Sequence, residues 1–187
     1  MIEGEQIENV YFFEYLGCKF TADGDSMADI KHRLDIAQAA FGSLNKLWSD
    51  HRLPTSMKLR LYKTAVCSTL THACEAWDFT KEARRTVNGF NSRCLNRLTG
   101  KSYRATATDP DFDLVLAIRK RRMRYLGHLL RMSSDRLVRR TLIAYVSSPD
   151  GPPKGSLLDD CTSKHIEELN AQASDRKTWR MMIDNLK

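Results

Sequence analysis

Two groups of aspartates carry the residue type with which phosphoryl-transfer enzymes hold metal ions. Asp109, Asp111 and Asp113 alternate in the segment DPDFD, and Asp159 and Asp160 are adjacent in LLDDC. Paired carboxylates that hold two metal ions stabilise in-line displacement at phosphorus in polymerases and nucleases. Both groups, however, stand at the predicted start of a helix, where aspartates cap the first turn and interact favourably with the helix dipole. We therefore expect structural roles for both groups, and neither catalytic nor metal-binding residues in this chain.

A second candidate for metal binding is the group formed by Cys67, His72, Cys74 and Cys94. Its C-x4-H-x-C spacing is not one that zinc sites use, and no C-x2-C pair occurs. Cys67 and Cys74 lie one heptad apart on a predicted helix with apolar neighbours, which favours buried structural thiols. The five cysteines of the chain are odd in number and show no close pairing, which favours reduced thiols over a disulfide framework.

The N-terminal segment lacks the basic and apolar regions of a signal peptide, and no apolar stretch approaches the length of a membrane span. Together with the cysteine pattern, this predicts an intracellular protein, nuclear or cytoplasmic, that is not secreted and has no membrane partner. The length of 187 residues and the hydrophobic content of 42% allow one or two domains. The oligomeric state stays open at this point.

Positive charge is the strongest chemical signal in the sequence. Thirty Lys and Arg against 23 Asp and Glu give a net charge of +7 and a pI near 9.3, which favours polyanionic partners. Residues 119 to 140 hold nine Lys or Arg and a single acid, Asp135. Because a salt-bridged surface helix carries alternating acids, this one-signed excess favours contact with a phosphate backbone over a merely solvated face. A second basic series lies on and after the third predicted helix: Lys81, Arg84, Arg85, Arg93, Arg97, Lys101 and Arg104.

Helical periodicity over residues 113 to 132 separates apolar from cationic side chains. Met123, Leu126, Leu129 and Leu130 fall on one side of a helical wheel, and basic side chains gather on the other. The expected partner is RNA, DNA or an RNA–DNA hybrid, held through its phosphates. The residues predicted to bind nucleic acid are Lys120, Arg121, Arg122, Arg124, His128 and Arg131.

These charges need helices to position them, and the apolar pattern predicts a mainly α-helical fold. Residues 10 to 21 alternate in β-favouring types and close at Asp23-Gly24, which predicts a short hairpin with Gly17 at a bend or bulge. Apolar residues at steps of three and four then predict three helices: a long one from Asp25 to about Trp48, one that opens at Pro54 with Thr55, and one from Thr80 to Gly100.

Three helices joined by short links predict a compact bundle. The polar segment KSYRATATDP separates it from a second helical section, which contains the basic helix, a shorter helix over residues 134 to 146 and two amphipathic segments at the end. We therefore predict an N-terminal β-hairpin over residues 1–24, a thumb-like helical bundle over 25–100 and a basic C-terminal helical region over 101–187.

The ordered set of segments resembles the C-terminal part of reverse transcriptases from non-LTR (LINE-type) retrotransposons. Single matches such as Tyr-Leu-Gly are weak, but their order and similar spacing make the set specific, and it covers nearly the whole chain. The segments are FEYLGCKFTADGD, DIKHRLDIAQAAFGSLNKLW, KLRLYKTAVCSTLTHACEAW, FNSRCLNRLTG, RRMRYLGHLLRM, and LLDDCTSKHIEEL with DRKTWRMMI.

The resemblance implies that the hairpin is similar to the primer grip that closes the palm, with Tyr15, Leu16 and Gly17 as its elements, and that the following helices form the thumb that clamps template–primer duplex. The fingers and most of the palm, including the aspartates that bind catalytic Mg²⁺ in the parent polymerase, are not in this sequence. We therefore expect no cofactor and no independent polymerase activity here, although the parent family consists of RNA-directed DNA polymerases.

Two functional hypotheses follow from the sequence. The first is a nucleic-acid-binding thumb fragment of a retrotransposon reverse transcriptase, which grips template–primer duplex by shape and phosphate. The alternative is a non-catalytic helical relic or protein-interaction module with no nucleic-acid role. Nucleic-acid affinity across a salt series distinguishes the two hypotheses, because binding to phosphates weakens steeply as ionic strength rises.

Overall fold

The chain opens with an antiparallel hairpin. The computed structural model describes residues 8–100, 112–147, 152, 154–161, 163 and 165–186. Strands β1 (Phe12–Tyr15) and β2 (Cys18–Thr21) pair in a register that places Tyr15 opposite Cys18. The two residues between them, Leu16 and Gly17, have φ values of 50° and 74°, the pattern of a type I′ turn. Gly17 therefore lies in the hairpin turn itself and not at a bulge, whereas Asp23-Gly24 follows the hairpin and leads into the first helix.

The first predicted helix is divided in two. Helix α1 (Ser26–Ser43) begins after Asp25, whose side chain accepts a hydrogen bond from the Met27 N–H at 2.8 Å, and α2 (Asn45–Ser49) follows after Leu44. The indole of Trp48 is buried and donates to the Phe41 carbonyl at 2.7 Å. Because Trp48 satisfies a carbonyl of the last turn of α1, the break leaves fewer backbone acceptors without a partner.

The second predicted helix also departs from a continuous α-helix. Helix α3 (Thr55–Leu61) continues into the π-helical segment η1 (Tyr62–Cys67) and then α4 (Ser68–Leu70). Ser and Thr hydroxyls along it donate back to carbonyls four residues earlier, which bends helices. The chain leaves the helix near Ala73, at φ 55°, before the short 3-10 helix η2 (Cys74–Ala76). The predicted helix is therefore correct only as far as Leu70.

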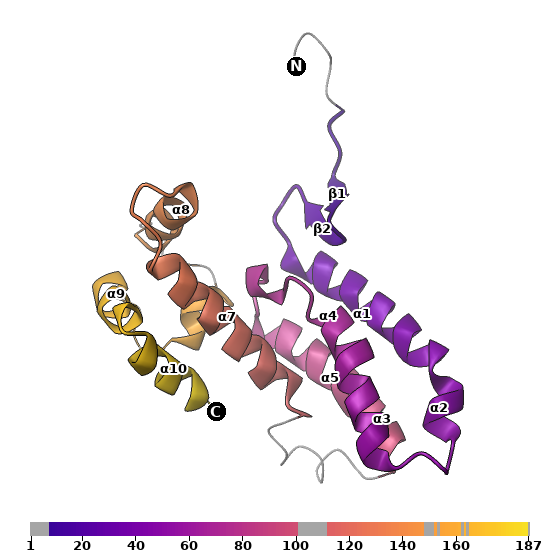
Figure 1. Ribbon diagram of the computed structural model, residues 1–187. Coiled ribbons are helices and arrows are strands. Elements are labelled where there is room, and N and C mark those ends of the chain that lie inside the picture. The colour runs from indigo at the N-terminus through magenta and orange to yellow at the C-terminus, as the bar shows by residue number, and fades with distance from the viewer. Residues whose placement is uncertain are drawn as a thin grey trace.

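The third predicted helix is confirmed at both ends. Helix α5 (Lys81–Thr99) starts where the Thr80 hydroxyl accepts from the Ala83 N–H, and it stops at Gly100, whose φ of 65° favours glycine. The remaining elements are α7 (Leu114–Leu130), α8 (Leu137–Val146), the 3-10 helix η4 (Leu157–Asp160), α9 (Ile166–Ser174) and α10 (Arg176–Asp184). The mainly α-helical fold with one N-terminal hairpin is thus confirmed (Figure 1).

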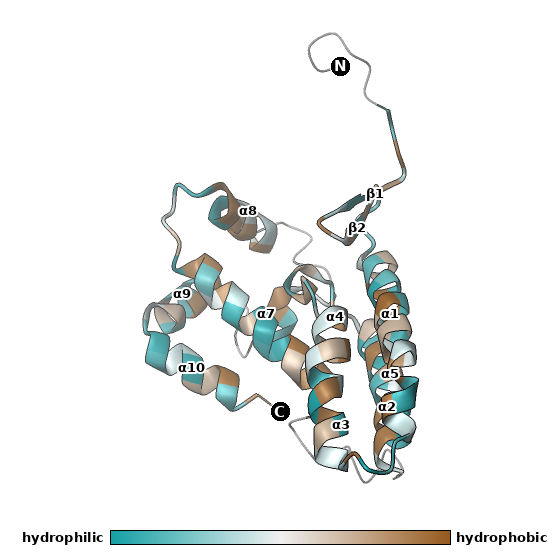
Figure 2. Ribbon diagram, turned by 45° about the vertical axis from the view of Figure 1, so that its right-hand side comes forward, coloured by the Kyte–Doolittle hydropathy of each residue, from teal (hydrophilic) through white to brown (hydrophobic). Residues whose placement is uncertain are grey.

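Helix α7 connects two hydrophobic cores. Its first turns carry Leu114 and Ile118 into a core built by α1 to α5, and its later turns carry Met123 and Leu126 into a core shared with α8, η4, α9 and α10. Figure 2 shows hydrophobic and hydrophilic residues mixed along α7, as expected for a helix with one buried and one exposed face. The predicted boundary between bundle and basic region falls mostly on residues 101–111, which lie outside the described residues.

Helix α10 packs closely on α7 because of one glycine. A Cβ on Gly127 would lie 2.7 Å from Cδ1 of Trp179 and closer still to its Nε1, so only glycine leaves room for the indole. The same Nε1 donates to the Met123 carbonyl at 2.9 Å. In the described ranges no helix combines the length and the apolar character needed to cross a bilayer.

Candidate nucleic-acid interface

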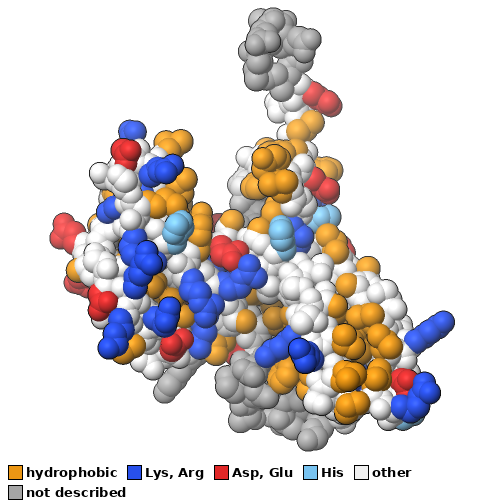
Figure 3. Space-filling view, viewed as in Figure 1, with side chains coloured by type: hydrophobic (Ala, Val, Ile, Leu, Met, Phe, Trp, Pro, Cys, Tyr) orange, Lys and Arg blue, Asp and Glu red, His pale blue; other side chains and the backbone are white. Residues whose placement is uncertain are grey.

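The outer face of α7 is cationic, as its periodicity predicts. Arg124 and His128 are exposed, and Lys120, Arg121 and Arg131 are half-buried. Figure 3 shows Lys and Arg side chains gathered over the part of the molecule formed by α7 and α10, with few acids among them. The structure thus brings five of the six side chains predicted to bind nucleic acid to an accessible surface.

Arg122 is the exception, because its side chain is fully buried. Its Nη1 lies 3.2 Å from Oδ2 of Asp160, and its Nη2 donates to the Gly155 carbonyl at 2.7 Å. Burial lowers the pKa of the guanidinium, and the nearby Asp160 carboxylate opposes that effect. The prediction that Arg122 contacts phosphate is wrong, because the helical rotation turns this position toward η4 and the carboxylate that neutralises it.

The Asp159-Asp160 pair is structural, although it does not cap a helix. The buried Asp160 carboxylate lies 3.4 Å from Nη2 of Arg84, 2.8 Å from Nε of Arg119 and 3.2 Å from Nη1 of Arg122, so it joins α5, α7 and η4. Asp159 accepts a hydrogen bond from the Gly155 N–H at 2.6 Å. Both aspartates belong to η4 itself, which corrects the expectation that they open a helix.

Metal ligation finds no support in the described part of the chain. The residues that the structure describes contain no group of three His, Cys, Asp or Glu arranged to hold an ion. Of the alternating aspartates, Asp113 caps α7 by accepting from the Leu116 N–H at 2.9 Å, as predicted, whereas Asp109 and Asp111 lie outside the described residues.

The five cysteines are free, and the buried ones have weakly acidic thiols. Burial raises the pKa of Cys74 to about 12 and that of Cys94 to about 11. Cys67, half-buried beside them, likewise has its pKa raised to about 12 by burial. The prediction of buried structural thiols is confirmed for Cys74 and Cys94.

Arg121 is partly engaged within the protein. Its Nε donates to Oε1 of Glu75 at 2.8 Å and its Nη1 to the hydroxyl of Thr71 at 2.9 Å. This half-exposed ion pair contributes little to stability, but it orients the side chain and neutralises part of its charge. The exposed cations of α7 beyond it are therefore the stronger candidates for phosphate contact.

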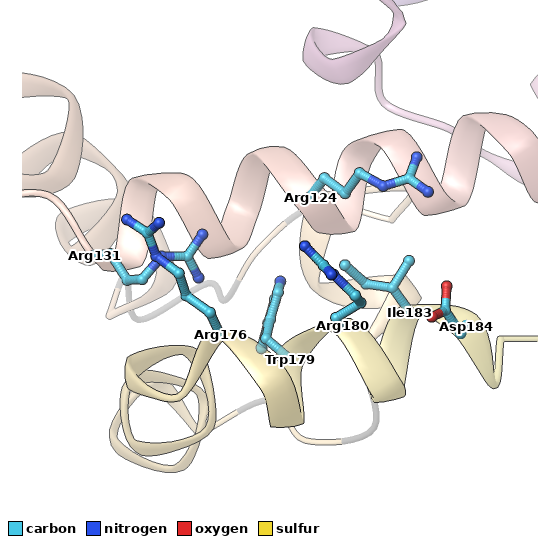
Figure 4. A pocket seen from close by; sticks show the side chains of 7 residues that line it. All are labelled: Arg124, Arg131, Arg176, Trp179, Arg180, Ile183 and Asp184. Atoms are coloured by element: carbon cyan, nitrogen blue, oxygen red, sulfur yellow. The ribbon is translucent and has the colours of Figure 1, made fainter.

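Helix α10 supplies cations that the sequence reasoning missed. Arg176 and Arg180 are exposed on α10 and lie beside Arg124 and Arg131 of α7, with Trp179 between them (Figure 4). Their spacing of four residues, with a tryptophan between them in RKTWR, is a helical-face signal that could have identified them.

The predicted primer-grip residues lie elsewhere. Tyr15 and Leu16 are strongly exposed at the tip of the hairpin, and a Cβ on Gly17 would lie 3.3 Å from Nη2 of Arg33. Figures 1 and 2 both place this hairpin at the start of α1, away from the outer face of α7. The structure therefore does not combine the hairpin tip and the cationic helix into one site.

The second basic series is dispersed in the fold. Arg84 pairs with Asp160, and the guanidinium of Arg97 lies 6.0 Å from the ring centre of Phe41. Arg85 and Arg93 are exposed on α5, and so is Lys81. The last two members of the series, Lys101 and Arg104, lie outside the described residues.

Comparison with known proteins finds a similarity to a transposon-derived protein. The chain is 24% identical, over an alignment that covers 95% of it and 72% of the other protein, to a Caenorhabditis elegans protein described as an uncharacterized transposon-derived protein. No protein-family profile matches the chain. No solved structure matches it either. The chain is thus similar over nearly its whole length to a protein that derives from a transposon.

Proposed function

We propose that this protein binds nucleic acid through the paired surface of α7 and α10, as the thumb and post-thumb part of a retrotransposon reverse transcriptase would. The observation that carries the proposal is the set of exposed guanidinium groups that two packed helices bring to one face. Similarity to a transposon-derived protein supports it. The ligand is an RNA–DNA hybrid or another duplex, held through its phosphates without sequence readout.

The proposal assigns no catalytic step to this chain. Asp160 belongs to an internal ion cluster and Asp113 caps α7, and in this proposal catalysis with Mg²⁺ belongs to the palm of the parent polymerase. The role of these helices is to hold a duplex in place, which needs fixed cations and a rigid support.

A protein-interaction role is the second candidate, favoured by the hairpin. Phe12, Phe13 and Phe20 are about half exposed on it, and Phe13 stacks on Phe20 with ring centres 5.3 Å apart. Exposed aromatic side chains at a two-stranded edge are typical of surfaces that another protein covers. This role would leave the α7 and α10 surface merely solvated.

Fluorescence anisotropy with a short RNA–DNA hybrid across a salt series tests the proposed function. We expect affinity to fall steeply with salt, and Lys120→Ala/Arg124→Ala to reduce the logarithmic salt slope by about one for each phosphate that the variant no longer neutralises. The matched control, Lys46→Ala/Arg60→Ala, removes two exposed charges from α2 and α3 and should leave most of the affinity in place. Absence of binding even at low salt would favour the protein-interaction role.

A further inference from the structure

A pocket lies between α7 and α10 within the cationic surface. Its volume is about 350 Å³, and four of its lining residues are arginines. In Figure 4, Arg131 and Arg176 approach each other from the two helices at one end, Arg180 rises from α10 toward α7, and the guanidinium of Arg124 extends along α7 away from the other three. The full lining is Arg124, Arg131, Arg176, Trp179, Arg180, Ile183 and Asp184.

The charges of this pocket are not balanced. Asp184 is its one acid against the four arginines, and none of Arg124, Arg176 and Arg180 forms an ion pair with any residue that the structure describes. Desolvation lowers the pKa of Arg131, and the charge of Arg176 lowers it further. Like charges held this close are relieved by a bound anion.

One of the four arginines is held in place by a hydrogen bond within the protein, and the helices that carry them are fixed by packing. Nη1 of Arg131 donates to the Ala173 carbonyl at 3.0 Å, which holds the side chain toward α9 and α10. The buried Trp179 and Ile183 fix α10 on α7, and the space at Gly127 sets how closely the two helices approach. Because the backbone of both helices and the Arg131 side chain are positioned before binding, the entropy cost of anion binding is limited to ordering the exposed side chains.

The chemistry of the lining selects phosphate. Each guanidinium offers a planar pair of donors that matches two phosphate oxygens, which a lysine cannot do. A phosphomonoester carries between about 1.5 and 2 negative charges near neutral pH and three free oxygens. An internal phosphodiester carries one charge and two free oxygens, so it satisfies four arginines less well.

We propose that the pocket binds a phosphomonoester group, and that this group is the terminal phosphate of a nucleic-acid strand. The proposal rests on the proposed function, because Arg124 lines the pocket and also belongs to the cationic face of α7. A duplex that lies along that face would bring its phosphorylated end to α10. The shared chemistry also fits a free nucleoside monophosphate, and the experiment separates the two sources.

Anisotropy with internally labelled RNA–DNA hybrids of one sequence tests this, with hydroxyl ends, a 5′-phosphate or a 3′-phosphate. We expect one phosphorylated form to bind about tenfold more tightly than the hydroxyl form. Arg176→Ala/Arg180→Ala should weaken all three hybrids, because it removes two cations of the binding surface, and should in addition abolish that ratio. Lys46→Ala/Arg60→Ala should preserve the ratio. Arg176→Lys/Arg180→Lys keeps the charge but not the paired donors, so it should lose most of the ratio. Circular dichroism confirms that each variant is folded.

Each outcome decides a different claim. Equal affinity for all three hybrids, with steep salt dependence, overturns the pocket assignment and leaves the proposed function standing. If no hybrid binds but adenosine 5′-monophosphate binds to the unmodified protein and not to Arg176→Ala/Arg180→Ala, the strand-end source and the proposed function are both overturned. If neither hybrids nor the nucleotide bind, both proposals fail.

Discussion

Leu16 stands in a conformation that L-residues other than asparagine and aspartate rarely adopt. Its φ of 50° places it in the left-handed region, and its side chain is 77% exposed, so no packing compensates for the strain. The turn type requires positive φ at both central positions, and Gly17 meets that requirement without strain. The free-energy cost of the backbone strain is therefore concentrated at Leu16.

Replacing Leu16 with asparagine should stabilise the hairpin. Asn-Gly is the preferred pair for a type I′ turn, and removal of the strain should contribute about 0.5–1 kcal/mol. Amide hydrogen exchange of β1 and β2 measures the effect as slower exchange. The control Leu47→Asn lies on α2 and should not slow exchange in the hairpin, and unchanged rates in Leu16→Asn would contradict the strain argument.

Asp160 is the residue on which the internal charge cluster depends. Asp160→Asn would remove the carboxylate that Arg84, Arg119 and the fully buried Arg122 share. Loss of one partner from a buried ion cluster costs about 3–5 kcal/mol of the free energy of unfolding. Urea denaturation should show that loss, and Asp35→Asn, at an exposed position of α1, should change stability by less than about 0.5 kcal/mol.

The buried thiols give the molecule a pH dependence at the alkaline end. The pKa of Cys74 is about 12 in the fold, against 9.0 for an ordinary thiol, because burial disfavours the thiolate. The unfolded chain therefore loses this proton first, and stability falls as the pH rises from about 9 toward 12. Cys74→Ser should flatten that part of the stability profile, and Cys74 should resist alkylation at pH 8 in the native protein. Rapid alkylation of Cys74 there would contradict the assigned burial.

At the scale of elements, helix ends were the most predictable features. Thr80, Gly100 and Asp113 act through hydrogen bonds or backbone angles within a few residues, so the local sequence is sufficient to identify them. The break at Leu44 and the exit after Leu70 were not predicted, and the segment after the exit is held by contacts with other parts of the fold. Trp77, for example, donates to Asp29 on α1 at 2.6 Å, and no local pattern predicts that bond.

For the candidate site too, the sequence predicted only what depends on local residues. Periodicity predicted the cationic face of α7 correctly, because the alternating apolar and basic residues all lie within one continuous helix. Arg122 was misassigned since its partner, Asp160, lies on a distant 3-10 turn. The contribution of Arg176 and Arg180 required knowledge that α10 packs beside α7, which only the fold supplies.

Gly127→Ala should separate α10 from α7. The added methyl would overlap the Trp179 indole, so α10 must shift or detach. We expect a loss of about 1–3 kcal/mol, as for other overpacked sites, together with faster hydrogen exchange in α10 and red-shifted tryptophan emission. Gly42→Ala, at a helical site with open space, provides the control and should be neutral or slightly stabilising.

At the scale of the whole molecule, α7 is the structural link between two cores. Each core is closed by its own helices, and the ion cluster around Asp160 adds a polar connection between α5, α7 and η4. A substitution that destabilises the second core should therefore destabilise the two cores unequally. Its effect should reach the α1 to α5 bundle mainly through α7.

Leu169→Ala tests this organisation. Leu169 is fully buried on α9 in the second core, and its truncation should cost about 2–5 kcal/mol. Hydrogen exchange should accelerate most in α8, α9 and α10, and less in α1 and α5. Val66→Ala, in the first core, should show the reverse distribution, and identical patterns for the two variants would indicate one cooperative unit instead.

The contact between Gly127 and Trp179 affects how the gene for this protein can accumulate substitutions. Arginines on a surface tolerate replacement by other polar residues one at a time, so the positive charge is lost gradually under random substitution. The glycine accepts no side chain at all while the indole opposes it, so a single missense change there removes the support of α10 at once. Among related gene copies, the glycine and the tryptophan should therefore disappear together, and copies that retain both should be those in which selection still preserves a function of the α7 and α10 surface.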